Sequence, residues 1–153
     1  GAPHWDPAAR GTICGLERSS SRAHLCRAAL EAIALQSHDL IQLMQSCSGL
    51  ELRELRVDGG VGRSELLLQL QANLLQCRIM RSAQLESTAL GAVYFAGLAL
   101  GFWREEAEIA ANWNSDWRLA PRIVKSELSE LQTAWQKGLE RAKSWALSQD
   151  CDA

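Results

Sequence analysis

The sequence predicts an α/β fold with a largely parallel sheet, and three observations carry that prediction. Short β-prone runs alternate with stretches in which apolar residues recur at helical spacing. The run Leu52–Val57 passes directly into Asp58-Gly59-Gly60 and then into a leucine-rich helix. At 47% hydrophobic, the 153 residues suffice for one domain with a buried core. Strands and helices in alternation imply βαβ units, whose helices cover the faces of the sheet.

The first 51 residues are expected to hold a loop, a strand and a long helix. Residues 1–10 carry two prolines and open, without an initiator Met, in what reads as the middle of a loop, so we expect a segment of a longer protein. Gly11–Leu16 predicts a short strand, and the serines that follow predict a helix cap. The helix should run from Arg22 to Ser46 and stop at Ser48-Gly49. Its predicted inward face consists of Cys26, Ala29, Leu30, Ile33, Ser37, Leu40, Ile41 and Met44.

The middle of the chain predicts a βαβ unit around the double glycine. After the 52–57 strand, Ser64-Glu65 begins a second helix, and Cys77–Met80 forms a brief strand. Gly59 and Gly60 expose backbone N–H groups near a helix N-terminus, where a nucleotide can approach without meeting a Cβ. Asp-Gly-Gly also marks any tight strand-to-helix turn, so the turn alone does not establish a site. The inward leucines of the second helix are expected to be Leu67, Leu70, Leu74 and Leu75.

The stretch Ser87–Trp103 is uncharged and rich in small residues. Its 17 residues are at the lower limit for a membrane span, and Gly97-x-x-x-Gly101 is a spacing that packs membrane helices; the alternative is a helix buried in a protein core. We favour the buried helix, because Glu86 before it and Arg104-Glu105-Glu106 after it give no inside-outside charge bias.

The last third is expected to hold an irregular connection and one amphipathic helix. Trp113–Trp117 and Pro121 belong to the connection, the helix runs from about Ser126 to Trp145, and Gln149–Ala153 reads as a frayed tail. Residues 1–104 would then form the core strands and helices, and residues 105–153 a C-terminal helical extension. The inward stripe of the last helix consists of Leu128, Leu131, Trp135, Leu139 and Ala142.

Charge and cysteine usage narrow the function classes. Sixteen Lys and Arg stand against 18 Asp and Glu, and the basic residues are scattered among acids, so we expect no nucleic-acid or membrane-surface partner. An odd number of cysteines without a C-x-x-C pair favours a reducing cytoplasm. Four of the five lie in apolar runs, which predicts buried free thiols, and the three histidines lie at no ligand spacing from them, so no Cys or His metal site is expected. The cysteines are Cys14, Cys26, Cys47, Cys77 and Cys151.

Four stretches, in this order, resemble the FGGY family of carbohydrate kinases. The loop Gly1–Gly11 resembles the segment that leads into a family signature, and Gly11–Leu16 with His24-Leu25 and Ala28–Glu31 matches that signature. The third stretch is similar to the adenosine-binding turn and helix of the family, and the fourth to the helix behind it. These two are Leu55–Gly60 with Leu68–Ala72, and Glu86–Ala92.

The resemblance implies a ribonuclease H-like (actin-like ATPase) C-terminal lobe, incomplete here, of a two-domain kinase. ATP and Mg²⁺ would lie in the cleft between the domains, and the acceptor would be glycerol or a related polyol or sugar. Family members that act on glycerol contact the nucleotide through the second glycine of the turn and an Asn four positions later. Gly59 and Gly60 would therefore line the nucleotide, together with Ser64 in place of the Asn. A Ser here is equally well explained as a helix N-cap.

Three further polar residues have structural explanations that we prefer. Asp6 lies beside Trp5, where approach to a cleft is the functional alternative, but an Asp before a proline in a loop is usually a turn former. Glu31 closes the signature, but a carboxylate on a helix is more often a structural partner than a catalyst. His24 reads as a partly buried polar side chain near a helix start.

The parts of a kinase that carry the chemistry are expected upstream of Gly1. These are the phosphate-binding loops, the polyol site, the base, the Mg²⁺ ligands and an N-terminal domain. We therefore expect the isolated segment to be inactive, and marginally stable because strands of its sheet are missing. The rival hypothesis is a truncated, non-catalytic module that binds a nucleotide weakly or only offers an interaction surface. Self-association remains open. A ribonuclease H-like nuclease is excluded because no acids cluster at strand ends.

Overall fold

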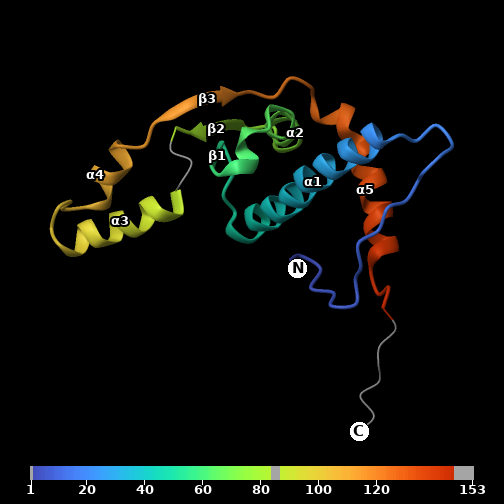
Figure 1. Ribbon diagram of the computed structural model, residues 1–153, viewed down its shortest axis with the longest axis horizontal. Helices are drawn as coiled ribbons and strands as arrows, with labels where there is room; N and C mark the ends of the chain where they lie inside the picture. Colours follow the sequence, from blue (N-terminus) through green and yellow to red (C-terminus); the bar gives the residue numbers. More distant parts are fainter. Residues whose placement is uncertain (1, 84–86, 147–153) are drawn as a thin grey trace, which may run out of the picture. The chain divides into compact units, whose positions relative to one another are not determined.

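The computed structural model describes residues 2–83 and 87–146, which form two compact units (Figure 1). One unit is continuous and comprises residues 52–122, and the other combines residues up to Glu51 with those from Ile123 onward. Parts of the sequence expectations, namely Gly1, Glu86, Cys151 and the tail Gln149–Ala153, lie outside the described residues.

The continuous unit contains the predicted βαβ arrangement. Strands β1 (Glu54–Val57) and β2 (Arg78–Ser82) pair in parallel, with Glu54 opposite Arg78 and Val57 opposite Arg81. Helix α2 (Glu65–Leu75) connects them, as the sequence predicts. A third strand, β3 (Ser115–Leu119), pairs antiparallel to β2 and completes the order β1-β2-β3.

Strand β3 corrects the expectation of an irregular connection at Trp113–Trp117. Alternate residues Ser115, Trp117 and Leu119 are half-buried while those between them are exposed, which is the period of a strand with one covered face. The turn-forming residues just before the strand, Asn112 and Asn114, hide this short alternation in the sequence.

The core of this unit lies between α2 and the sheet. Its buried residues are Leu68 and Ala72 of the helix, Cys77 just before β2, and Ile79 within β2. Leu67, Leu70 and Leu74 are buried as predicted, and Leu75 is half-buried. The half-buried apolar residues packed around this core are Leu52, Leu55, Val57, Leu75, Trp117 and Leu119.

Helix α3 (Ser87–Ala99) begins where expected, but it ends before the predicted Trp103 and is not buried. Phe95 is 78% exposed, and Gly97 is the only buried residue among positions 88–99. The small residues serve a local contact instead: a Cβ at Gly97 would overlap the ring of Trp103, which also meets Tyr94 edge-on at 5.3 Å between centroids. Among the described residues, no helix combines the length and apolar character needed to cross a membrane.

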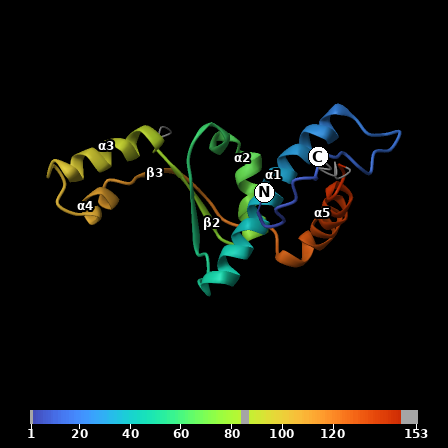
Figure 2. The same ribbon diagram turned by 90° about the horizontal axis from the view of Figure 1, so that it is seen from below.

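A short helix that the sequence analysis missed, α4 (Glu106–Ala111), follows α3. The two helices lie side by side in both views (Figures 1 and 2). Six residues complete fewer than two turns, too few for an apolar period to be recognised.

The discontinuous unit contains two long helices, α1 (Arg22–Ser48) and α5 (Ser129–Ala142). Gly49 ends α1 with φ +68°, and its N–H donates to the carbonyl of Gln45 at 2.9 Å, a common helix stop. A single 3₁₀ turn, η2 (Lys125–Leu128), precedes α5, so the regular helix is shorter at both ends than predicted.

The predicted inward face of α1 is wrong. Ile33 and Met44 are 42% and 60% exposed, whereas the buried positions are Ala34, Leu35 and His38. Apolar residues occur on several sides of this helix, so their spacing alone does not select the packed side.

No strand forms over Gly11–Leu16 in the structure, and Ile13 is 69% exposed. A strand is stabilised only by pairing with a neighbour, and no described strand pairs with this run. The thiol prediction holds in part: Cys14, Cys26, Cys47 and Cys77 are all free, but only Cys77 is buried. Burial raises the pKa of the Cys77 thiol.

Candidate functional site

Gly59 and Gly60 follow β1 after one intervening residue, Asp58, and Gly60 begins a 3₁₀ turn, η1 (Gly60–Arg63). Gly59 has φ +78° and ψ 177°, a combination that is essentially restricted to glycine. A Cβ built on either residue would meet no atom within 4 Å beyond its chain neighbours. The turn is therefore an open backbone surface at the carboxyl end of a parallel strand.

The two glycines differ in what requires them. Gly59 is fixed by its backbone conformation, whereas Gly60 has no positive φ and is exposed. Within the described chain, neither conformation nor packing explains why position 60 lacks a side chain. Close approach by a molecule from outside the chain would explain it.

Ser64 is the N-cap of α2, in agreement with the structural alternative stated for it. Its Oγ accepts a hydrogen bond from the N–H of Leu67 at 3.4 Å, and its own N–H donates to the carbonyl of Val61 at 3.1 Å. The capping bond uses the hydroxyl as an acceptor and leaves its hydrogen available for donation. Nucleotide contact at Ser64 is compatible with this geometry.

A hollow of about 400 Å³ lies beyond the carboxyl ends of β1 and β2 in the same unit. Asp58, directly before the glycine turn, lines it together with Ser82 and Trp113, and the guanidinium of Arg56 lies 4.2 Å above the Trp113 ring. Open α/β sheets bind ligands at this edge. Ser82 and Trp113 were not predicted to lie near Asp58; the available signal was that Asp58 follows β1 and Ser82 ends β2.

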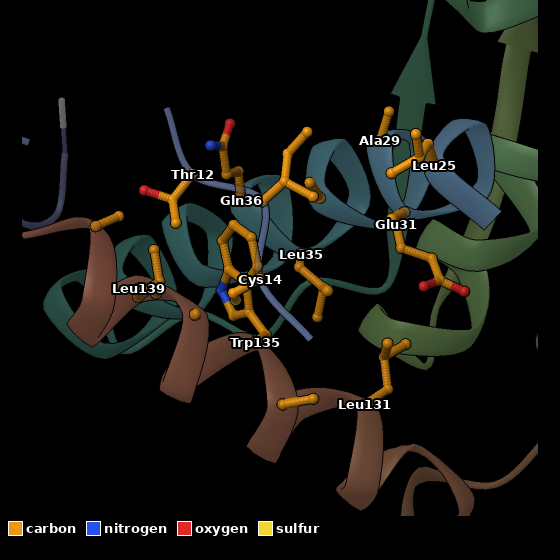
Figure 3. A pocket seen from close by; sticks show the side chains of 16 residues that line it. Thr12, Cys14, Leu25, Ala29, Glu31, Leu35, Gln36, Leu131, Trp135 and Leu139 are labelled. Carbon is orange, nitrogen blue, oxygen red and sulfur yellow. The ribbon is translucent and has the colours of Figure 1, made fainter. Parts of the chain in front are cut away.

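The discontinuous unit has a groove of its own, about 430 Å³, between α1 and α5 (Figure 3). Figure 3 shows Trp135 of α5 directed toward α1, with Thr12 and Cys14 at its border. Trp135 Nε1 donates to Asp39 Oδ2 at 2.7 Å, which ties the two helices together. The groove is mostly apolar and holds no set of converging polar groups.

The three polar residues judged structural have structural partners, and all belong to this discontinuous unit. Asp6 Oδ1 accepts from the N–H of Ala8 at 2.8 Å, as expected of a turn former, and Oδ2 accepts from the N–H of Ser144 at 2.6 Å. The Ser144 hydrogen bond is the main cause that lowers the pKa of Asp6. Glu31 pairs with Arg27 at 2.6 Å.

His24 corrects one expectation, because it is exposed rather than partly buried. Its Nδ1 accepts a hydrogen bond from the N–H of Ser21 at 3.0 Å, so the ring satisfies a free amide at the start of α1. No group of three or more His, Cys, Asp or Glu side chains that could hold a metal occurs within residues 2–83 and 87–146. The described residues thus offer no Mg²⁺ cage of their own.

The chain is similar to known glycerol kinases in sequence. The chain is 51% identical over 146 residues to the glycerol kinase of Dechloromonas aromatica and 48% identical over 145 residues to that of Deinococcus radiodurans. Each alignment covers 95% of this chain and 29% of the relative, so the chain spans under a third of the relatives' length.

Solved structures give the same picture. A Plasmodium falciparum glycerol kinase with ADP superimposes with a TM-score of 0.80 at 30% identity, over 92% of this chain and 28% of that one. A ligand-bound xylulose kinase from Lactobacillus acidophilus gives 0.70 at 25% identity, over 93% and 30%. The expected ribonuclease H-like fold is confirmed by these neighbours. Residues 1–100 match the C-terminal domain of the FGGY family of carbohydrate kinases, and the chain belongs to that family.

Proposed function

We propose that this chain forms the nucleotide-side wall of an ATP-dependent glycerol kinase. The complete enzyme would transfer the γ-phosphoryl group of ATP to a primary hydroxyl of glycerol and yield glycerol 3-phosphate. The observation that carries the proposal is the open backbone at Gly60, for which the described chain offers no internal reason. The roughly 50% identity to glycerol kinases and the likeness to a relative solved with ADP support the same ligand.

The chemistry assigned to this chain is positioning rather than reaction. Gly59 would hold the turn, Gly60 would let the adenosine lie against the backbone, and the hydroxyl hydrogen of Ser64 would donate to the nucleotide. The N-terminal end of α2 adds a partial positive charge near the turn, which favours an anionic ligand. Mg²⁺ would neutralise phosphate charge when bound. We place the Mg²⁺ ligands, the base and the glycerol site in the N-terminal domain and other parts of the kinase. We propose that the complete protein is cytoplasmic.

The test is a Gly60→Ala substitution in the complete kinase, with ADP binding measured by calorimetry. A methyl group at position 60 has room within the chain but occupies the place of the ligand, so we expect ADP affinity to fall at least about fivefold, on the order of 1 kcal/mol. Gly62→Ala is the matched control, because a Cβ there makes ordinary contact with Val57 at 3.9 Å inside the unit. Unchanged ADP affinity in Gly60→Ala would contradict the proposal.

Ser64 provides a second test, in which a substitution is expected to increase ADP affinity. Asn also caps helices, and its amide reaches further and carries more donors than a hydroxyl. Ser64→Asn should therefore keep α2 intact and tighten ADP binding several-fold, by about 0.5–1.5 kcal/mol for one added hydrogen bond. Ser64→Ala should weaken both the cap and the binding. If Ser64→Asn and Ser64→Ala bind ADP equally, position 64 does not contact the nucleotide.

Measurements of ATP turnover test two points together, namely which acceptor is phosphorylated and whether the rest of the kinase is required. We expect the complete enzyme to phosphorylate glycerol faster than xylulose, and the isolated 153 residues to release no ADP. A preference for xylulose would favour a kinase for another sugar, the alternative suggested by the xylulose kinase neighbour. ATP turnover by the isolated segment would contradict the proposal that the catalytic groups lie outside these 153 residues.

A non-catalytic interaction module is the second candidate, and one observation favours it. Large apolar side chains lie exposed along and after α3, a surface typical of a region that contacts other polypeptide. Sequencing the gene upstream of Gly1 separates the candidates, since an intact N-terminal domain favours the kinase and a nearby start codon favours the module. The exposed residues are Val93, Phe95, Leu100 and Phe102.

A further inference from the structure

No further inference is drawn: the strongest candidate, the apolar groove between α1 and α5 that Thr12, Ile13 and Cys14 border, carries no docking site, because nothing in the structure shows what covers it.

Discussion

Helices α2 and α3 belong to the same unit and are both strongly apolar, yet one is enclosed and the other is open. Leu68 of α2 is 1% exposed, whereas Phe95 of α3 projects into solvent. The cause is connectivity: α2 joins two parallel strands, and such a crossover must pack back onto the sheet. Helix α3 is followed by α4 and an antiparallel strand, so no crossover holds it on a face. The sequences of α2 and α3 are both apolar, but the strands that each helix connects determine whether it packs onto the sheet.

The largest effect should come from Leu68→Ala, with Phe95→Ala as its counterpart on α3. Removing the enclosed Leu68 side chain leaves a cavity against the sheet and should lower the free energy of unfolding by about 2–5 kcal/mol. Phe95→Ala should change it by less than about 0.5 kcal/mol, because the ring is exposed. Urea titration followed by circular dichroism measures both. Equal losses would mean that α3 is covered in solution, and the contrast between the helices would fail.

The turn before α2 should show the next largest effect. Gly59→Ala forces an alanine into a backbone region that only glycine occupies readily, so we expect a loss of about 1–3 kcal/mol in the free energy of unfolding. Gly60→Ala, one residue later, should leave thermal unfolding nearly unchanged. If the two variants unfold alike, the turn does not have the conformation described, and Gly60→Ala loses its value as a binding test.

On α3, Gly97→Ala tests the close approach of the Trp103 ring to this helix. The new Cβ displaces the Trp103 ring, while alanine improves helix propensity, so the net change in unfolding free energy should stay below about 1 kcal/mol. The indole NMR signal of Trp103 should shift clearly. Gly91→Ala in the same helix meets no neighbour and serves as the control. An unmoved indole signal in Gly97→Ala would show that the ring does not lie on the helix.

The smallest effect is expected at the exposed ion pair between β2 and β3. Arg81 holds Asp116 through two hydrogen bonds, Nε–Oδ1 at 3.0 Å and Nη2–Oδ2 at 3.1 Å, and thereby lowers the pKa of Asp116. A lowered pKa stabilises the folded state above the ordinary value of 3.8, and this contribution is lost as the pH falls through the lowered pKa. Carboxyl NMR titration should give a midpoint below 3.8 that rises in Arg81→Lys. A midpoint unaffected by Arg81→Lys would contradict the ion pair.

The elements that the sequence predicted correctly are those specified by nearby residues. Arg22 begins α1 and Ser64 caps α2 because caps depend on a few adjacent groups. The predictions for residues 11–16 and for β3 were wrong for opposite reasons. The β-prone run at 11–16 has no partner strand and forms no strand, whereas the weakly alternating residues of β3 form one because they pair with β2. Strand formation depends on residues far away in the chain, which local patterns do not contain.

The candidate site was predictable only in outline. Two adjacent glycines after a strand indicate an open turn. The sequence does not show that the backbone conformation requires glycine at position 59, whereas nothing within the described chain requires it at position 60. The hollow shared by Asp58 and Ser82 likewise depends on β1 and β2 lying parallel, in register. A site formed by one turn can be predicted from the sequence. A site formed by the ends of two strands can be predicted only when the pairing of those strands is known.

The division of the chain has a practical consequence for protein engineering. Residues 52–122 are an insertion, so a protease cut anywhere inside them would leave the two halves of the interrupted unit as separate peptides. After such a cut, the contacts that hold the two halves together include the side-chain hydrogen bonds Asp39–Trp135 and Asp6–Ser144 and the backbone bonds from Arg10 to Ala142 and from Ala146 to Ala8. In a split-protein reporter built on this unit, these non-covalent contacts would have to hold the two pieces together.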